Sequence, residues 1–125
     1  MKNIRIGVIG AGETGTPLLR QLIDASFIEL VGVADLSDSQ PGMLLVRDKG
    51  VHTTNDFMDI ARMGTDVDII IDTTGVPKVR ESLRQHFQDS GNRHTVIMHE
   101  TIVLLMMSLS QGKLVQGKHD THDYA

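Results

Sequence analysis

Cysteine is absent from this chain of 125 residues, which excludes disulfides, thiolate metal ligands and thiol nucleophiles. The chain also lacks a basic surplus, since 12 lysines and arginines face 16 acidic residues and leave a net charge of −4. That balance argues against binding to nucleic acid or to an anionic membrane surface. No apolar run approaches the roughly 20 residues of a membrane-spanning helix, and the N-terminal segment lacks the pattern of a secretory signal. We therefore expect a cytoplasmic protein.

Short apolar runs, rich in valine and isoleucine, recur along the chain. Consecutive apolar positions are typical of strands that are covered on both faces, as in a parallel sheet. The sequence predicts five such strands, at Ile4–Ile9, Ile28–Ala34, Val51–Thr54, Val67–Ile71 and Thr95–Met98.

Helical patterns fill the segments between these runs. Proline near the start and glycine after the end mark several of them. The predicted helices are Thr14–Ala25, Gln40–Lys49, Asn55–Met63, Val76–Ser90 and Thr101–Ser110. Alternating strands and helices imply right-handed crossovers, and thus a doubly wound α/β fold with a parallel sheet of five or six strands in the order 3-2-1-4-5. We expect one domain over residues 1–112, no substrate domain, and a polar tail over residues 113–125.

A glycine-rich turn follows the first predicted strand. Gly10-Ala11-Gly12-Glu13-Thr14-Gly15 has the spacing G-x-G-x-x-G, and Asp35 ends the next strand twenty positions beyond Gly15. This context is the fingerprint of a dinucleotide-binding βαβ unit. Gly10 permits the tight turn, Gly12 lets a pyrophosphate approach the backbone, and Gly15 lets the helix pack closely. The alternative is a strand–helix turn that no longer binds a ligand, and the negative charge of Glu13 counts against binding.

Asp35 also indicates which dinucleotide is preferred. Its carboxylate suits the hydroxyls of an adenine ribose and repels a 2′-phosphate. The following residues Leu36, Ser37 and Asp38 supply no basic group for such a phosphate. The sequence therefore predicts NAD in preference to NADP.

Three segments together carry a family resemblance. "IRIGVIGAGETGTPLLRQL", "ELVGVAD" and "VDIIIDTTG" resemble the N-terminal Rossmann domain of the glucose–fructose oxidoreductase and inositol dehydrogenase family. The stretch "VADLSDSQPGMLLVRDKGVHTT" is similar to the NAD-binding modules fused to some bacterial sensor kinases. The resemblance implies that Gly10, Gly12, Glu13, Thr14 and Gly15 lie at the pyrophosphate, that Asp35 lies at the ribose, and that Thr73, Thr74 and Gly75 lie near the nicotinamide.

The chain departs from that family after its fifth predicted strand. The family's Glu-Lys-Pro motif is replaced by His99-Glu100-Thr101-Ile102, so Thr101 stands where the resemblance places a lysine. His99 and Glu100 are either an acid–base pair or a polar strand end, and His99 is the one candidate for a catalytic residue. Thr73 and Thr74 either bond a cofactor or cap the helix near Val76.

Two further segments suggest interactions. The helix Thr101–Ser110 is apolar all round, which favours a homodimer formed through it over simple coverage of the sheet. In the tail, His119 and His122 are either ligands of a metal or part of a disordered polar end. Because two histidines are poor preorganisation for zinc, we expect no metal site.

Three functions are compatible with the sequence. The first is a stand-alone NAD(H)-binding module that senses redox state or serves as a regulatory or partner subunit, with a signalling or substrate-domain protein as its partner. The second is a small oxidoreductase that completes its active site by oligomerisation or with a second chain. The third is a module for another nucleotide-containing ligand such as coenzyme A.

Overall fold

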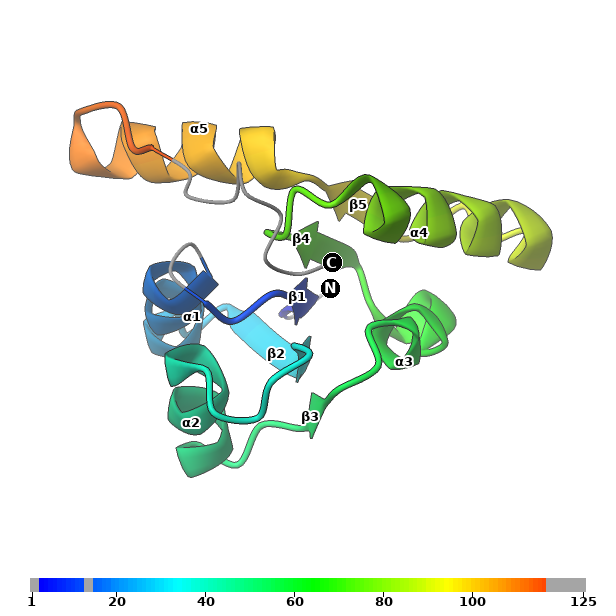
Figure 1. Ribbon diagram of the computed structural model, residues 1–125, viewed down its shortest axis with the longest axis horizontal. Coiled ribbons are helices and arrows are strands. Elements are labelled where there is room, and N and C mark those ends of the chain that lie inside the picture. Colours follow the sequence, from blue (N-terminus) through cyan, green and yellow to red (C-terminus); the bar gives the residue numbers. More distant parts are fainter. Residues whose placement is uncertain (1–2, 13–14, 117–125) are drawn as a thin grey trace.

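The computed structural model describes residues 3–12 and 15–116, which form a parallel sheet covered by helices on both faces. Its five strands lie in the order β3-β2-β1-β4-β5, as predicted. They are β1 (Ile4–Ile9), β2 (Ile28–Ala34), β3 (Thr53–Thr54), β4 (Ile69–Asp72) and β5 (Val96–Met98). All four strand pairs are parallel, with Val8 of β1 beside Val33 of β2 and Ile71 of β4. The sheet runs through the centre of the molecule in Figure 1.

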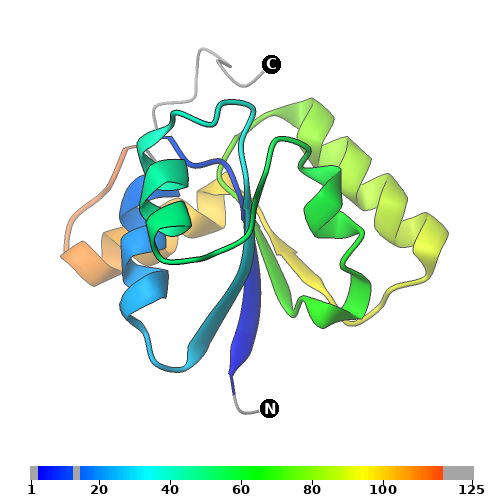
Figure 2. The ribbon, with the colours of Figure 1, turned by 90° about the horizontal axis from the view of Figure 1, so that it is seen from below.

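Two helical layers cover the sheet (Figure 2). One layer holds α1 (Gly15–Asp24), α2 (Pro41–Asp48) and α5 (Glu100–Gln111), and the other holds α3 (Met58–Ala61) and α4 (Pro77–Ser90). Each layer encloses its own apolar cluster against the strands. Leu19 of α1, Met43 of α2 and Val103 of α5 belong to the first cluster, and Leu83 of α4 belongs to the second. Burial on both faces explains the apolar runs Ile6–Ile9 of β1 and Ile69–Ile71 of β4.

The predicted helix over Asn55–Met63 is wrong in extent. Only Met58–Ala61 is α-helical, and a 3₁₀ turn, η1 (Gly64–Asp66), follows it. Two local hydrogen bonds explain the late start, because the Asp56 N–H donates to Thr54 Oγ1 (3.1 Å) and the Met58 N–H donates to Asp56 Oδ1 (3.0 Å). Polar side chains that bond the nearby backbone in this way compete with helix formation.

The helix α5 buries only one of its sides. Val103 and Met107 are buried, whereas four apolar side chains with helical spacing remain exposed: Ile102, Leu105, Met106 and Leu109. Beyond α5 the chain turns back on the helix, where the Val115 N–H donates to Ser108 Oγ (2.9 Å) and Val115 packs against the core. The described part of the chain contains no helix long and apolar enough to cross a membrane.

Candidate functional site

The turn between β1 and α1 is shaped by two glycines that the fold itself requires. Gly10 has a φ of +101°, and a Cβ atom there would overlap Thr73 Oγ1. A Cβ atom on Gly15 would overlap the carbonyl oxygen of Gly10. Packing inside the chain therefore accounts for both glycines without any ligand.

Gly12 differs from these two glycines. A Cβ atom on Gly12 would make only ordinary contacts with the side chain of Gln40, the nearest at 3.6 Å. Nothing within the described chain therefore demands glycine at this position. Gly12 lines a cleft of about 590 Å³, a size typical of ligand sites, whose other walls come from α1, α2 and the end of α5. The neighbouring candidates Glu13 and Thr14 lie outside the described residues.

Asp35 lies at the carboxyl end of β2 and is bound to the glycine turn. Its Oδ2 accepts a hydrogen bond from the Ala11 N–H (2.7 Å) and its Oδ1 accepts one from the Ser37 N–H (3.1 Å). The residue is only 4% exposed. Each carboxylate oxygen has two lone pairs, so a further hydroxyl donor can still be accepted. The carboxylate therefore fixes the turn and keeps acceptor capacity beside it.

Thr73 and Thr74 are buried and already hydrogen-bonded. The Thr73 hydroxyl lies within hydrogen-bond distance of the carbonyl oxygens of Ile9 (3.0 Å) and Gly10 (3.2 Å). The Thr74 hydroxyl donates to Asp72 Oδ1 (2.6 Å) and accepts from the N–H of Val76 (3.1 Å), the N-cap residue of α4. Both hydroxyls thus support the turn and the start of α4.

Asp72 and His99 form a hydrogen-bonded pair at the carboxyl ends of β4 and β5. His99 Nδ1 lies 3.0 Å from Asp72 Oδ2, and Asp72 is 1% exposed. The other oxygen of Asp72 accepts from the N–H of Thr74 (2.9 Å) and from its hydroxyl. Since that carboxylate only accepts, Nδ1 of His99 carries the proton of this hydrogen bond, and in the neutral ring Nε2 is the acceptor. The sequence singled out His99 and missed Asp72, although Asp72 ends an apolar strand as Asp35 does.

Glu100 packs against Gly75 beside this pair. Its Oε2 is buried and has no hydrogen-bond partner among the described residues. Gly75 has a φ of +66°, and a Cβ atom on it would lie 2.9 Å from Glu100 Oε1. The positive φ therefore favours glycine there, and a side chain would also displace the carboxyl group of Glu100. Together with the turn, Asp35 and the Asp72–His99 pair, these residues line one end of the sheet, where parallel α/β folds bind their ligands.

A second cleft, of about 790 Å³, adjoins His99 between α4 and β5. Arg80 and Arg84 of α4 line it, and the sequence reasoning missed both. Their spacing of four residues could have indicated two basic side chains on one face of a helix. No cluster of three or more potential metal ligands occurs within residues 3–12 and 15–116. His119 and His122, for which the sequence predicts no metal site, lie outside the described residues.

Comparison with known proteins places these features in context. No family model matches the chain. Over 88 residues it is 33% identical to an acetaldehyde dehydrogenase from Leptothrix cholodnii, an alignment that covers 68% of this chain and 29% of that protein. The solved structure of the WlbA dehydrogenase from Chromobacterium violaceum, in complex with NADH and UDP-GlcNAcA, matches with a TM-score of 0.61 and 19% identity.

The chain has the Rossmann fold. The NAD complex of GenD2 from gentamicin A biosynthesis matches 90% of this chain and 33% of its own chain, with a TM-score of 0.59 and 15% identity. The myo-inositol 2-dehydrogenase from Lactobacillus plantarum matches 89% of this chain and 42% of its own, with a TM-score of 0.57 and 15% identity. The resemblance to the inositol dehydrogenase fold is therefore confirmed, and the resemblance to sensor-kinase modules stays a prediction. The chain spans less than half the length of each of these proteins.

Proposed function

We propose that the chain binds NAD(H) at the turn between β1 and α1. The observation that carries the proposal is Gly12, the one glycine of the turn that internal packing does not require. The pyrophosphate of the cofactor would lie against Gly12 and the N-terminus of α1, whose helix dipole favours an anion. NAD(H) would supply hydride transfer when bound.

Asp35 supports the preference for NAD over NADP. Its carboxylate would accept a ribose hydroxyl and would repel a 2′-phosphate. Arg47 reaches the loop after β2, where its Nη2 lies 3.7 Å from Asp38 Oδ1 in an ion pair, so its charge is already partnered. NAD is therefore the cofactor that we expect to bind more tightly.

Gly12→Ala tests the cofactor site, because the added methyl group fits the fold and occupies ligand space. We expect the wild-type unfolding temperature and a loss of NAD⁺ affinity of at least about tenfold, measured by calorimetry. Gly10→Ala is the matched control, since its methyl group clashes with Thr73 and should lower stability. Titration with NADP⁺ tests the preference for NAD over NADP. Titration with coenzyme A tests whether the chain is instead a module for another nucleotide-containing ligand. Unchanged NAD⁺ affinity in Gly12→Ala would contradict the site.

The role that we propose for bound NAD(H) is regulatory, as a redox-sensing module or partner subunit. A second role, as an oxidoreductase that completes its site with another chain or by oligomerisation, is favoured by one observation, the Asp72–His99 pair. A cytoplasmic location is part of the same proposal. Turnover with NAD⁺ separates the two roles.

A second copy of the chain is the partner that we propose for the exposed side of α5. The four exposed side chains there are apolar, and residues 101–111 contain no charged residue, so two copies of α5 can pack about a two-fold axis without repulsion between like charges. Light scattering should give the mass of a dimer, and Leu105→Asp should give a monomer because it buries an unpaired charge. Gln111→Glu adds a charge beyond these side chains and should leave the dimer intact.

A further inference from the structure

The charged side chains that line the cleft between α4 and β5 are all basic. Three arginines contribute to it, Arg80, Arg84 and Arg93, together with His99 and apolar side chains such as Ile97, and no acidic residue does. The cleft runs along the seam between α4 and β5, from Arg80 and His99 at the carboxyl end of β5 to Gly91 and Arg93 at its amino end. The Asp72–His99 pair lies at the first of these two ends. A cleft with positive walls and a partly apolar surface suits a small organic anion.

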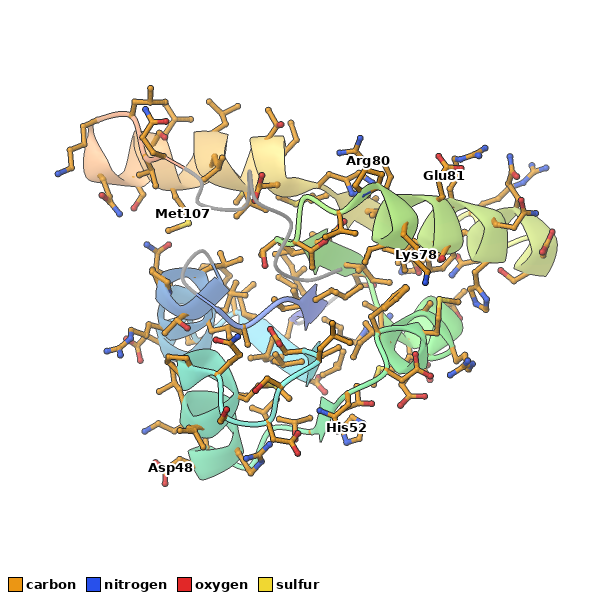
Figure 3. All side chains as sticks on the ribbon, in the orientation of Figure 1. Asp48, His52, Lys78, Arg80, Glu81 and Met107 are labelled. Carbon is orange, nitrogen blue, oxygen red and sulfur yellow. The ribbon has the colours of Figure 1, made fainter. Side chains whose placement is uncertain are left out.

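Of the three arginines of the cleft, Arg80 and Arg93 form no ion pair among the described residues, and Arg80 is the one near the start of α4, at the end of the cleft where His99 lies. Arg84 is held by Glu81 of the same helix, with 2.6 Å between Nη2 and Oε2. No carboxylate of the described residues lies within ion-pair distance of Arg80. Figure 3 shows Arg80 and Lys78 extending from opposite sides of α4, and only Arg80 lines the cleft. A planar guanidinium is well suited to carboxylate or phosphate oxygens.

His99 is held in one orientation beside this cleft. Its ring is fixed by Asp72 through Nδ1, and its carbonyl oxygen accepts from the N–H groups of Ile102 (3.0 Å) and Val103 (3.2 Å) at the start of α5. His99 is 28% exposed at its side chain, whereas Asp72 is buried beneath it. This is the arrangement of an oriented general base, with Nε2 available to accept a proton.

We propose that the cleft binds the anionic group of a small hydroxy compound, a carboxylate or a phosphate ester, and that His99 accepts the proton of its hydroxyl. Bound NAD⁺ would be the oxidant, since it would take up the hydride from the carbon–hydrogen bond that breaks and would become NADH. The oxygen–hydrogen bond breaks with its proton passing to Nε2 of His99, and the alcohol is oxidised to a carbonyl. This step rests on the proposed function for its oxidant and belongs to its second role, that of an oxidoreductase, whereas anion binding in the cleft depends on neither role.

Anion binding is tested on the full chain without cofactor, by calorimetric titration with oxalate and with inorganic phosphate. Arg80→Gln should weaken binding about tenfold, whereas Lys78→Gln, which removes the same charge from the other side of α4, should change it less than about twofold. If oxalate binds more tightly than phosphate, the cleft is a carboxylate site. If phosphate binds more tightly, it is a phosphate site. Equal effects of the two substitutions, or no binding of either anion, would overturn the proposal.

The proton-accepting role has a spectroscopic readout besides turnover. Nitrogen NMR of the His99 ring should show the proton on Nδ1 in the wild type and on Nε2 in Asp72→Asn, because the amide of asparagine donates to Nδ1. Wild-type protein with NAD⁺ should form NADH from hydroxy acids or glycerol 3-phosphate and not from glycerol or myo-inositol. His99→Gln and Asp72→Asn should lose that turnover and still bind oxalate.

The outcomes separate this inference from the proposed function. Gly12→Ala should weaken NAD⁺ binding and leave oxalate binding unchanged, whereas Arg80→Gln should weaken oxalate binding and leave NAD⁺ binding unchanged. Protein that binds NAD⁺ but oxidises none of the anionic alcohols overturns the role of His99 and leaves the cofactor site standing. Protein that binds oxalate but not NAD⁺ overturns the proposed function and keeps the anion cleft.

Discussion

The two ends of β4 and β5 each carry an aspartate–histidine pair, and the pairs differ in what surrounds them. At the amino end Asp68 Oδ1 lies 2.6 Å from His94 Nε2, and at the carboxyl end Asp72 Oδ2 lies 3.0 Å from His99 Nδ1. Both aspartates are buried. The same two residue types are thus paired at opposite ends of one strand pair, through Nε2 of His94 and through Nδ1 of His99.

The amino-end pair belongs to a closed ionic cluster. Asp68 also accepts from the backbone N–H of Arg5 (2.8 Å) and from its guanidinium at Nε (3.2 Å) and Nη2 (3.0 Å), which ties β1 to the start of β4. These hydrogen bonds hold the pKa of Asp68 well below its usual range, those from Arg5 contributing most. The carboxyl-end pair has no arginine on its carboxylate, and its histidine faces a cleft. One arrangement is suited to holding strands together, and the other leaves a nitrogen atom available for chemistry.

Replacing each aspartate by asparagine should separate the two roles, with the largest effect at the amino end. In Asp68→Asn the amide NH₂ group would face the guanidinium of Arg5, which stays protonated and only donates hydrogen bonds. In Asp72→Asn, His99 can accept from the amide by moving its proton to Nε2, so we expect a loss of only about 1 kcal/mol. Urea unfolding monitored by circular dichroism gives both values.

Asp66→Asn is the matched control for the amino end. Its carboxylate lies 3.9 Å from Arg5 Nη1 and is 89% exposed, so the free energy of unfolding should change little. A larger loss of stability in Asp72→Asn than in Asp68→Asn would reverse the assignment of structural and chemical roles.

The pH dependence of stability should report on the amino end. The pKa of Asp68 is lowered in the folded protein, so its contribution is fully present above the unfolded pKa, about 3.9, and is lost as the pH falls below it. Thermal unfolding measured between pH 6 and pH 3 should show this decline in the wild type and a smaller decline in Asp68→Asn. Parallel curves for the two proteins would contradict the cluster's role.

The smallest effect concerns Glu100 at the carboxyl end. Its Oε2 is buried and has no hydrogen-bond partner among the described residues, so Glu100→Gln removes a charge from that buried atom while keeping the shape that packs on Gly75. We expect stability to stay unchanged or to rise by about 0.5–1 kcal/mol in urea unfolding. Glu81→Gln is the control. It removes one partner of an exposed ion pair, so the free energy of unfolding should fall slightly. A marked loss in Glu100→Gln would mean that this carboxyl group has a partner in solution.

Periodicity and residue type determined the outline of the fold. Ile4–Ile9 and Ile28–Ala34 are strands with the predicted bounds, and the strand order is the predicted one. These features are local or follow from the alternation of strands and helices, so neighbouring residues carry the signal. The two-residue β3 and the shortened α3 were beyond that signal, because polar side chains of Thr54 and Asp56 bond the backbone between them.

Tertiary structure alone decided which polar residues form a site. The sequence marks Gly10, Gly12 and Gly15 equally, and only the contacts around each position separate the free Gly12 from the two packed glycines. Asp72 and His99 are 27 residues apart and meet because β4 and β5 are parallel and end at one edge of the sheet. Hydrogen bonds and charges act over a few ångströms in space, a distance that sequence separation does not encode. The sequence therefore specified the helices, the strands and the glycine turn. Packing specified the Asp72–His99 pair, the cleft between α4 and β5 and the exposed side of α5.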